Sequence, residues 1–492
     1  MPQTPEVVFS PILPELIVAG AAIAILLADA IRPIRDQRVL AFLALVALGA
    51  GAWATLRLWG PFAFDPAQPE RLTVLGGMVA ADRYALFFRL VILGSSAVAV
   101  LLASTYLRRT GEGRGEFFSL LLFATAGMTL LAASADLIMV FLSLEVLSLS
   151  LYVMAGFSLR RLASQEASLK YFLLGSFSSA FFLYGVALAY GAAGPPSLAG
   201  MAGGVSGGAA TGLAIAAAAL LLIGFAFKVA AVPFHMWTPD VYQGAPTPVT
   251  AFMAAGTKVA GFAALMRVTQ VALGGLGWDL QPVLYAVAIV TMVVGSLVAI
   301  AQSDVKRMLA YSSIAHAGFI LVGVTAGNQE GISGGMFYLV AYAAMIMGAF
   351  GVVMLVSRRG EGRTSLDSYR GLGRTNPGLA GLLALFLLSL AGIPPLAGFW
   401  GKVFVFEAAI AAGLWPLVVI GVLASVVAAF FYIQVLVLAY MQDPVEAEAV
   451  AEPAAAPAVA LIATAAVTVV FGFFPGLILG PLGEAAVLHW VP

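Results

Sequence analysis

The sequence predicts an all-α integral membrane protein with about fourteen transmembrane helices. Hydrophobic residues make up 62% of the 492 residues and charged residues only 10%, and the mean hydropathy is +1.03. Soluble domains carry about 25% charged residues. The apolar segments are also close to the roughly 20 residues that a helix needs to cross a bilayer. Little of the chain is left for a soluble catalytic domain.

Fourteen apolar segments are bounded by Gly, Pro or charged residues. In order they are 11–30, 39–59, 84–106, 117–134, 136–157, 168–192, 211–237, 248–269, 281–301, 308–326, 333–357, 378–412, 415–441 and 456–476. A straight helix over all of 378–412 would be about 52 Å long, against a hydrocarbon core of about 30 Å. We therefore expect a break at 391–398, where Pro394 and Pro395 remove backbone donors.

Composition excludes several classes of site. The chain has no cysteine, which removes disulfides, thiolate zinc sites and iron–sulfur clusters. Its three histidines, His235, His316 and His489, are too few and too scattered for a haem or metal centre. We expect the chain to bind no cofactor, so that any redox chemistry takes place in another chain. The net charge of zero argues against a nucleic-acid partner.

Basic residues lie mostly in alternate loops, which predicts orientation because loops on the inner side of the membrane are rich in Lys and Arg. The larger set has sixteen members: Arg32, Arg35, Arg38, Arg108, Arg109, Arg114, Arg160, Arg161, Lys170, Lys306, Arg307, Arg358, Arg359, Arg363, Arg370 and Arg374. The opposite set has five: Arg57, Arg71, Arg83, Arg89 and Arg267. We therefore expect both termini on the outer side. No basic residue precedes the first apolar run, so we expect that helix to be retained rather than cleaved as a signal peptide.

The three remaining basic residues, Lys228, Lys258 and Lys402, lie inside predicted spans. A charge there costs roughly 2.5–3.5 kcal/mol on an insertion scale. Glu145, near the middle of the fifth span, is a matching carboxylate. Lysines near helix ends can extend to the interface, but Lys258 is too central for that. We predict that Glu145 and Lys228 form a switchable ion pair on facing helices.

The lysines also suggest an internal repeat. Lys228 in span seven and Lys402 in span twelve each lie beside a Gly/Pro interruption, and they are five spans apart. An odd number of spans inserts the second copy upside down, as in transporters with inverted repeats and broken helices. The predicted units are an N-terminal segment 1–116, two five-helix units at 117–280 and 281–443, and an acidic linker with a C-terminal helix at 444–492. Ordinary kinks in unrelated helices are the alternative.

Two histidines are weaker candidates. His316 lies in the tenth span, the expected repeat counterpart of the span with Glu145, and imidazole can relay protons near neutral pH. A core histidine with satisfied hydrogen bonds is the alternative. His235 is interpreted as a capping or interface residue at the membrane boundary. The Gly-rich segment 191–212 is interpreted as an outer loop.

Several segments resemble subunit N of NADH-quinone oxidoreductase (respiratory complex I), an antiporter-like membrane subunit. They are SLEVLSLSLYVMAGF (143–157), SQEASLKYFLLGSFSSAFFLYG (164–185), GFAFKVAAVPFHMWTPDVYQGAPTPVTAFMAAGTKVAGF (224–262), SDVKRMLAYSSIAHAGF (303–319), SLDSYRGLGRTNP (365–377) and SLAGIPPLAGFWGKVFVF (389–406). FHMWTPDVYQGAPTPV is the most specific of these matches. A long Ala/Pro-rich acidic stretch at 443–458 departs from the pattern and is interpreted as a variable linker.

The resemblance implies that Glu145, Lys228, Lys258 and Lys402 move protons across a bacterial inner membrane, driven by quinone reduction in neighbouring subunits. The implied partners are a sister antiporter-like subunit, small membrane subunits and the lipid bilayer. NADH, FMN, iron–sulfur clusters and quinone would belong to the wider complex. Alternatives are a subunit of a multisubunit cation/proton antiporter, of a membrane-bound hydrogenase or of the photosynthetic relative of complex I. A stand-alone solute symporter and a purely structural scaffold are weaker alternatives.

Overall fold

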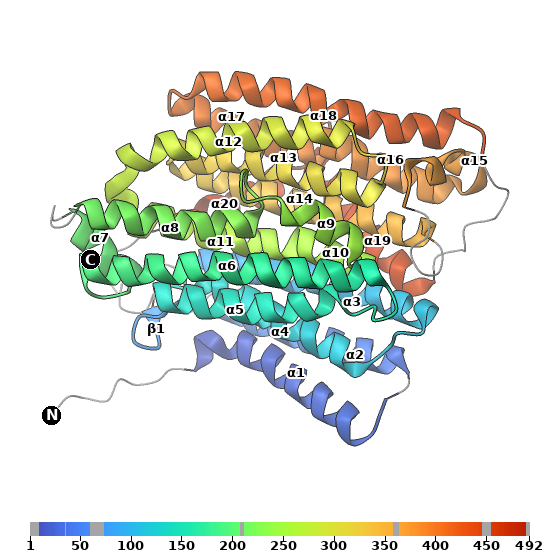
Figure 1. Ribbon diagram of the computed structural model, residues 1–492, viewed down its shortest axis with the longest axis horizontal. Coiled ribbons are helices and arrows are strands. Elements are labelled where there is room, and N and C mark those ends of the chain that lie inside the picture. The colour runs from blue at the N-terminus through green and yellow to red at the C-terminus, as the bar shows by residue number, and fades with distance from the viewer. Residues whose placement is uncertain are drawn as a thin grey trace.

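The computed structural model describes residues 9–34, 36–59, 73–206, 211–357, 364–444 and 454–488. Arg35, Arg71, Arg358, Arg359, Arg363, His489 and most of the predicted linker, 445–453, lie outside the described residues. The described chain is almost entirely helical and forms a single bundle in which most helices run side by side (Figure 1).

The first half of the chain contains α1 (Leu13–Ile31), α2 (Gln37–Trp59), α3 (Arg83–Thr110), α4 (Gly115–Ala133), α5 (Leu137–Ala155), α6 (Leu162–Ala193), α7 (Leu198–Ser206), α8 (Thr211–Val229), α9 (Trp237–Gly244), α10 (Thr247–Phe252) and α11 (Lys258–Arg267). The second half contains α12 (Gly277–Ile300), α13 (Val305–Ala326), α14 (Gln329–Val356), α15 (Leu372–Thr375), α16 (Pro377–Ala391), α17 (Ala397–Ala411), α18 (Trp415–Met441), α19 (Ala455–Phe473) and α20 (Gly476–Ala485). A two-stranded antiparallel sheet joins β1 (Thr73–Val74) to β2 (Val79–Ala80).

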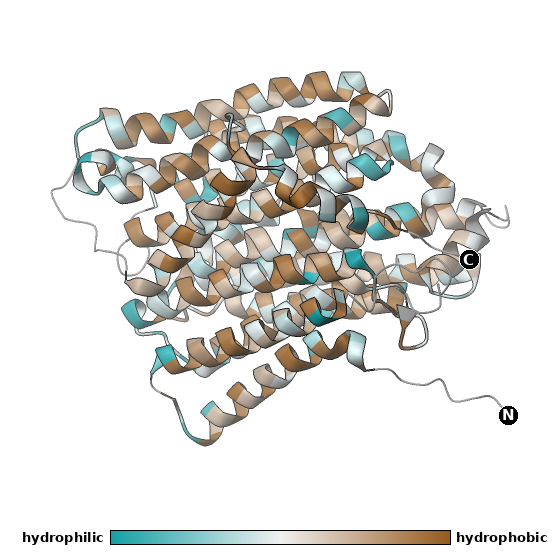
Figure 2. Ribbon diagram, turned by 180° about the vertical axis from the view of Figure 1, so that it is seen from behind, coloured by the Kyte–Doolittle hydropathy of each residue, from teal (hydrophilic) through white to brown (hydrophobic). Residues whose placement is uncertain are grey.

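The described residues include thirteen helices that are long and apolar enough to cross a membrane, the eighth running continuously over Thr247–Ala272. The remaining expected span, the twelfth (378–412), is the pair α16 and α17, which the break divides into two helices of 15 residues each. Hydrophobic residues line the helices along their length, and hydrophilic residues are more frequent toward the ends (Figure 2). The prediction of an all-helical membrane protein with broken helices is therefore confirmed.

The helices at the centre of the bundle differ from those at its edge. The span Thr247–Ala272, α13 and α14 are buried almost throughout, whereas α1, α6, α18 and α19 leave most of one face exposed. Apolar side chains on an exposed face suit a lipid or protein neighbour in the membrane. The central helices carry Lys258 and His316.

The two predicted five-helix units share a local feature. Asp136 caps the first turn of α5 and bridges to Ser197, and Asp304 caps α13 and bridges to Ser365. The separation is 61 residues in both units. Ser197 immediately precedes α7 and Ser365 precedes α15, and these two helices lie at opposite ends of the bundle (Figure 1). This arrangement is what an inverted repeat requires.

The first break separates α8 from α9. Helix α8 ends at Val229, and Ala230 adopts the left-handed conformation with φ of 61°. The backbone groups freed by the break are satisfied inside the protein: Trp237 Nε1 donates to the carbonyl of Phe227 at 3.0 Å, and the Val232 amide donates to Thr291 Oγ1 at 3.0 Å. Non-helical backbone at membrane depth is tolerated only with such partners.

The second break lies between α16 and α17, as predicted from Pro394 and Pro395. Gly392 ends α16 with φ of 88°, a conformation that glycine adopts without strain. The amide of Gly398 donates to Ser389 Oγ at 3.1 Å. Each break also contains a cis X-Pro peptide bond, Val232–Pro233 in the first and Pro394–Pro395 in the second.

Two local features differ from the sequence-based expectation. The Gly-rich segment 191–212 was expected to be a loop, but it contains the short helix α7, whose preceding Ser197 side chain accepts a hydrogen bond from the Gly200 amide at 3.1 Å. The hairpin β1–β2 was not expected. Both lie at the same end of the bundle (Figure 1).

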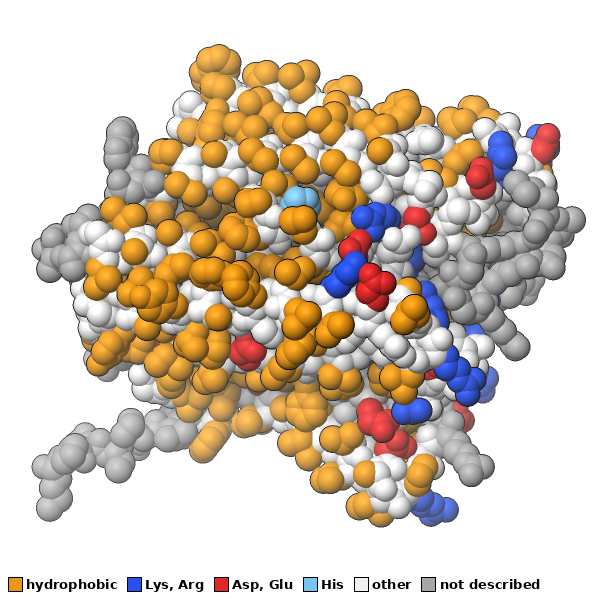
Figure 3. Space-filling model, in the orientation of Figure 1, with side chains coloured by type: hydrophobic (Ala, Val, Ile, Leu, Met, Phe, Trp, Pro, Cys, Tyr) orange, Lys and Arg blue, Asp and Glu red, His pale blue; other side chains and the backbone are white. Residues whose placement is uncertain are grey.

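Basic side chains gather toward the opposite end, where α15 lies (Figure 3). We call this the basic end of the molecule.

Candidate functional site

Lys258 lies at the centre of the bundle with 1% of its surface exposed. It follows a π-helical turn, Met253–Thr257, and a second π-helical turn, Val268–Ala272, follows α11. Such wider turns often mark functional sites in helices. The Lys258 ammonium donates to the carbonyl of Ser313 on α13, and it lies 5.7 Å from the centre of the Tyr342 ring on α14.

Lys228 lies in the last turn of α8, immediately before the first break, with 5% exposure. Helix α11 passes close to α8 at Gly261, where an added Cβ would lie 3.3 Å from Val229 Cγ1 and 3.5 Å from Lys228 Cγ. The ammonium of Lys228 donates to Ser148 Oγ on α5 at 2.8 Å and faces the Tyr171 ring at 5.7 Å.

Glu145 lies on α5, one helical turn before Ser148. Its carboxylate accepts a hydrogen bond from Ser179 on α6, and the residue is half-buried, between exposed apolar neighbours on the outer face of α5. Among the described residues, no ion pair within 4.0 Å joins Glu145 to Lys228. Each of the two charges has a serine as its hydrogen-bond partner instead. We call this arrangement, in which the two charged groups do not touch, the open position of the pair.

His316 is buried on α13 between two tyrosines. Its Nδ1 lies 2.7 Å from the Tyr338 hydroxyl, and its Nε2 lies 3.1 Å from the Tyr432 hydroxyl. The Tyr342 ring, which faces Lys258, lies 5.1 Å from the imidazole, measured between ring centres. His316 is thus connected to Lys258 through one side chain.

Lys402 lies on α17, just beyond the second break, with 5% exposure. Its ammonium donates to the carbonyl of Ala391 at 2.8 Å and to Ser425 Oγ at 2.5 Å. It lies 4.8 Å from the Phe319 ring, and that ring in turn lies 5.9 Å from His316, centre to centre. We call Glu145, Lys228, Lys258, His316 and Lys402 the polar row.

The structure also buries charges that sequence reasoning assigned to outer loops. Arg89 and Arg267 are fully buried, and they form ion pairs with Glu15 and Asp82 at 2.6 Å. Their positions just inside the ends of apolar segments were the only sequence signal that could have indicated this burial. Because both arginines are paired, they differ from the row lysines, which hold neutral partners.

A polar cavity of about 350 Å³ lies between α6 and α9, and no member of the polar row lines it. Asp240 is its central side chain: it accepts a hydrogen bond from Lys170 at 2.7 Å and from Arg307 at 2.6 Å. Partial burial alone would raise the pKa of Asp240, but the hydrogen bonds from these two cations hold it below its usual value. This network joins α6, α9 and α13.

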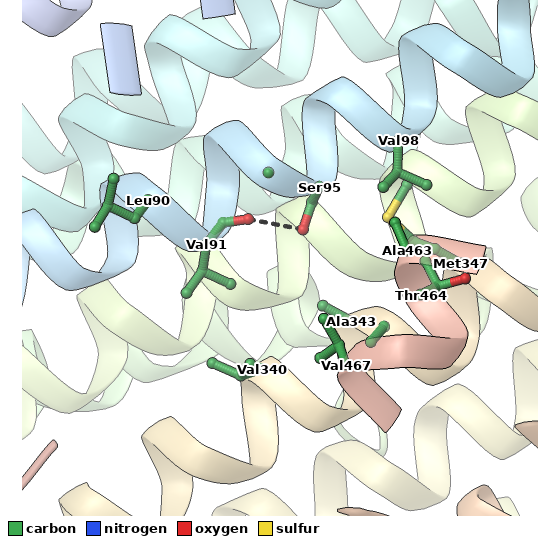
Figure 4. A pocket seen from close by; sticks show the side chains of 12 residues that line it. Leu90, Val91, Ser95, Val98, Val340, Ala343, Met347, Ala463, Thr464 and Val467 are labelled. Carbon is green, nitrogen blue, oxygen red and sulfur yellow. Dashed lines mark hydrogen bonds between the residues drawn. The ribbon is translucent and has the colours of Figure 1, made fainter. Parts of the chain in front are cut away.

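A separate cavity of about 270 Å³ is almost wholly apolar. It lies between α3, α14 and α19, and only Ser95 and Thr464 bring polar side chains to its wall (Figure 4). The Ser95 hydroxyl is bonded to the carbonyl of Val91. The cavity therefore offers no free polar side chain to a charged ligand.

The part of the chain that the structure describes contains no group of three or more metal-ligating side chains. His235, half-buried in the segment between α8 and α9, therefore belongs to no such group within the described residues.

The sequence matches the family model described as "NADH:quinone oxidoreductase/Mrp antiporter, TM" over residues 134–428. It is 42% identical over 470 residues to NADH-quinone oxidoreductase subunit N of Trichlorobacter lovleyi, covering 95% of each chain. It is 47% identical over 500 residues to subunit N of Acidothermus cellulolyticus, covering 96% of this chain and 94% of that one. The chain belongs to the NADH-quinone oxidoreductase subunit N family. It is thus a proton-translocating, antiporter-like membrane subunit of complex I.

Solved structures agree with this assignment. A chain of respiratory complex I from Thermus thermophilus with bound aureothin has 36% identity and a TM-score of 0.81, covering 96% of this chain and all of that one. A chain of the archaeal membrane-bound sulfane sulfur reductase has 26% identity and a TM-score of 0.86, covering 97% and 96%. A chain of the Mrp complex from Dietzia has a TM-score of 0.82 at 22% identity, covering 97% of each, which shows a shared fold only. The predicted family is confirmed.

Proposed function

We propose that the polar row is the proton pathway of this subunit N. The observation that carries the proposal is the position of His316 between two buried lysines: the Tyr342 ring contacts both His316 and Lys258, and the Phe319 ring contacts both His316 and Lys402. Lysine and histidine can each take up and release a proton, and an unpaired charge in a membrane core is retained mainly for function.

The roles follow from position. Lys228 packs against Gly261, three residues after Lys258 on α11, and passes the proton to Lys258. Lys258, whose contacts Ser313 and Tyr342 lie in the second five-helix unit, 281–443, passes the proton from the first unit, 117–280, to the second. Lys402, beside the second break, exchanges protons with one side of the membrane, which we assign to the outer side. Glu145 faces outward from α5 and receives the electrostatic signal from a neighbouring subunit.

The basic end is the inner side of a bacterial inner membrane in this proposal. The first described residues, before α1, lie at the opposite end of the bundle (Figure 1), where Ile12 packs in one cluster with Val79 of β2. This placement supports an outer location for the N-terminus, and an even number of spans then puts the C-terminus outside as well.

The neighbours in this proposal are a sister antiporter-like subunit and small membrane subunits of complex I. Exposing a half-buried carboxylate such as that of Glu145 to lipid costs free energy. Its position on the apolar face of α5 therefore supports a protein neighbour that covers this face. This chain would bind no cofactor, and NADH, FMN, iron–sulfur clusters and quinone would be held elsewhere in the complex.

The test is the number of protons pumped per electron in membrane vesicles that contain the assembled complex with Lys228→Ala, Lys258→Ala or Lys402→Ala. We expect quinone-coupled pumping to fall in each variant while NADH oxidation with an artificial electron acceptor continues. Lys170→Arg, which keeps the charge beside Asp240 outside the row, is the control. Unchanged pumping in all three variants would refute the pathway.

A further inference from the structure

Two serines separate the charges of Glu145 and Lys228. Ser148 accepts from the Lys228 ammonium at 2.8 Å, and Ser179 donates to the Glu145 carboxylate. Ser148 lies three residues after Glu145 on the same helix, so the ammonium is held about one helical turn from the carboxylate. The two charges are neighbours without being a pair.

The space between these residues allows movement. A crevice of about 20 Å³, lined by Ser148, Ser179 and Lys228 among others, lies between α5, α6 and α8. That volume is enough for one water molecule. Two glycines bring its walls close: a Cβ at Gly175 would lie 2.0 Å from the Tyr152 hydroxyl, and one at Gly224 would lie 2.6 Å from the Phe182 ring.

The serine hydrogen bonds compete with the ion pair, because both use the same ammonium hydrogens and carboxylate oxygens. An ammonium that moves toward Glu145 leaves Ser148, and Glu145 then accepts from Lys228 in place of Ser179 or beside it. Ser148 remains satisfied after Lys228 leaves, because its hydroxyl already donates to the carbonyl of Leu144 at 2.5 Å. In the open arrangement each charged group therefore keeps a hydrogen-bond partner. If the charges were merely separated, both would be buried without partners, which costs free energy.

We propose that Ser148 and Ser179 form a latch that holds Lys228 and Glu145 apart, so that the charge pair has an open and a closed position. Both serines are positioning residues, and the proposal rests on the proposed role of Lys228 in proton transfer. In the closed position the carboxylate keeps the proton on Lys228. In the open position the proton is free to pass to Lys258.

The latch is tested in the intact complex with Ser148→Ala, Ser179→Ala and the double variant. Loss of a hydrogen bond to a charged group shifts such an equilibrium by about tenfold or more. We expect cryo-electron microscopy of the double variant to place Lys228 against Glu145. We also expect the alkaline limb of the pumping pH profile to move by about one pH unit for each tenfold shift.

Matched controls distinguish the latch from general damage to the helices. Ser150→Ala removes a hydroxyl that is bonded only to the carbonyl of Val146 on the same helix, and Ser176 is exposed on α6. Both alanine variants should keep the wild-type pH profile. Ser148→Thr retains the hydroxyl and should restore the profile. If the double variant does not assemble, the single Ser148→Ala variant carries the same two measurements.

The outcomes separate the latch from the proposed pathway. Normal pumping by Lys228→Ala would overturn the proposed role of Lys228 in proton transfer, on which the latch rests, whatever the serine variants do. Loss of pumping in Lys228→Ala, together with an open pair and an unshifted profile in Ser148→Ala and the double variant, would overturn the latch alone.

Discussion

The imidazole Nδ1 of His316 lies 2.7 Å from the hydroxyl of Tyr338. A second phenol, Tyr432, lies 3.1 Å from Nε2, so both ring nitrogens have a polar partner. A neutral imidazole has one donor and one acceptor nitrogen, and therefore one tyrosine must donate and the other accept. A proton arriving at one nitrogen can leave from the other, which suits a relay between Lys258 and Lys402.

His316→Gln should reduce proton pumping by about tenfold or more, because glutamine can hydrogen-bond to the tyrosines but cannot carry a proton through its side chain. Pumping would be measured in vesicles together with NADH oxidation by an artificial acceptor. Tyr440→Phe, at an exposed tyrosine of α18, is the control. Wild-type pumping by His316→Gln would assign the histidine a structural role in the core.

Lys258→Ala should abolish most pumping, and Lys258→Arg should restore little of it. Arginine keeps the positive charge next to the Ser313 carbonyl, but its guanidinium does not release a proton near neutral pH. The measurement is the proton-to-electron ratio of the two variants in the same vesicles. Full pumping by the Arg variant would show that this position needs a charge and not a proton carrier.

Asp240 predicts an acid-sensitive contact between α6 and α13. Its pKa is below the usual value in the folded protein, so its ion pairs stabilise the fold above about pH 4 and are lost as the pH falls through the lowered pKa. The pairs are partly exposed, and each contributes up to about 1 kcal/mol. Asp240→Asn should lower the melting temperature at pH 7. On acidification, the melting temperature of this variant should then fall by less than that of the wild type.

Thermal unfolding of the purified complex at pH 7 and at pH 3–4 measures this effect. The exposed carboxylate of Glu330 on α14 provides the control, Glu330→Gln, whose melting temperature should match wild type at both pH values. Equal acid sensitivity in the Asp240→Asn variant and wild type would contradict the assignment.

Spans, breaks and row lysines were predictable because each has a local signal. Apolar length marks the helices, paired Gly and Pro residues mark the breaks, and a lysine within an apolar run is conspicuous at any position. The family followed from contiguous segments such as FHMWTPDVYQGAPTPV. None of these signals requires knowledge of which helices touch.

Contacts between helices could not be predicted in the same way. Tyr338, Tyr342 and Tyr432 are unremarkable aromatic residues in apolar helices, and only packing places two of them on His316 and one on Lys258. The sequence predicted Glu145 and Lys228 on facing helices, but the hydrogen bonds to Ser179 and Ser148 that separate the two charges depend on packing. Arg89 and Arg267 were counted as loop residues because their partners are distant in sequence.

The buried pair of Arg267 and Asp82 should be more important for stability than an exposed pair. Arg267 is fully buried and donates to Asp82 through both terminal nitrogens, at 2.6 and 2.9 Å. Asp82→Asn leaves the guanidinium without its counter-charge, a change that costs about 3–5 kcal/mol in a buried pair. The variant should lose activity on heating at a clearly lower temperature than wild type.

The exposed pair of Arg374 and Asp443 gives the comparison for that experiment. Their side chains are 63% and 84% exposed, so Asp443→Asn should change stability by less than about 1 kcal/mol. Similar heat inactivation of both variants would show that burial does not strengthen the Arg267 pair.

Lys402→Ala should slow proton release on the outer side more than uptake on the inner side, because Lys402 lies beside unwound backbone that can admit water. Gly392→Ala should give a milder form of the same defect. A Cβ there would lie 3.0 Å from Lys402 Nζ, and φ of 88° is strained for alanine.

Time-resolved proton uptake and release by the vesicle-bound complex would separate the two steps. Glu407→Gln, at an exposed position of the same helix, should behave like wild type. Unchanged uptake and release in Lys402→Ala would rule out the assignment of Lys402 to the exit, and equal slowing of both steps would place the lysine within the row rather than at its end.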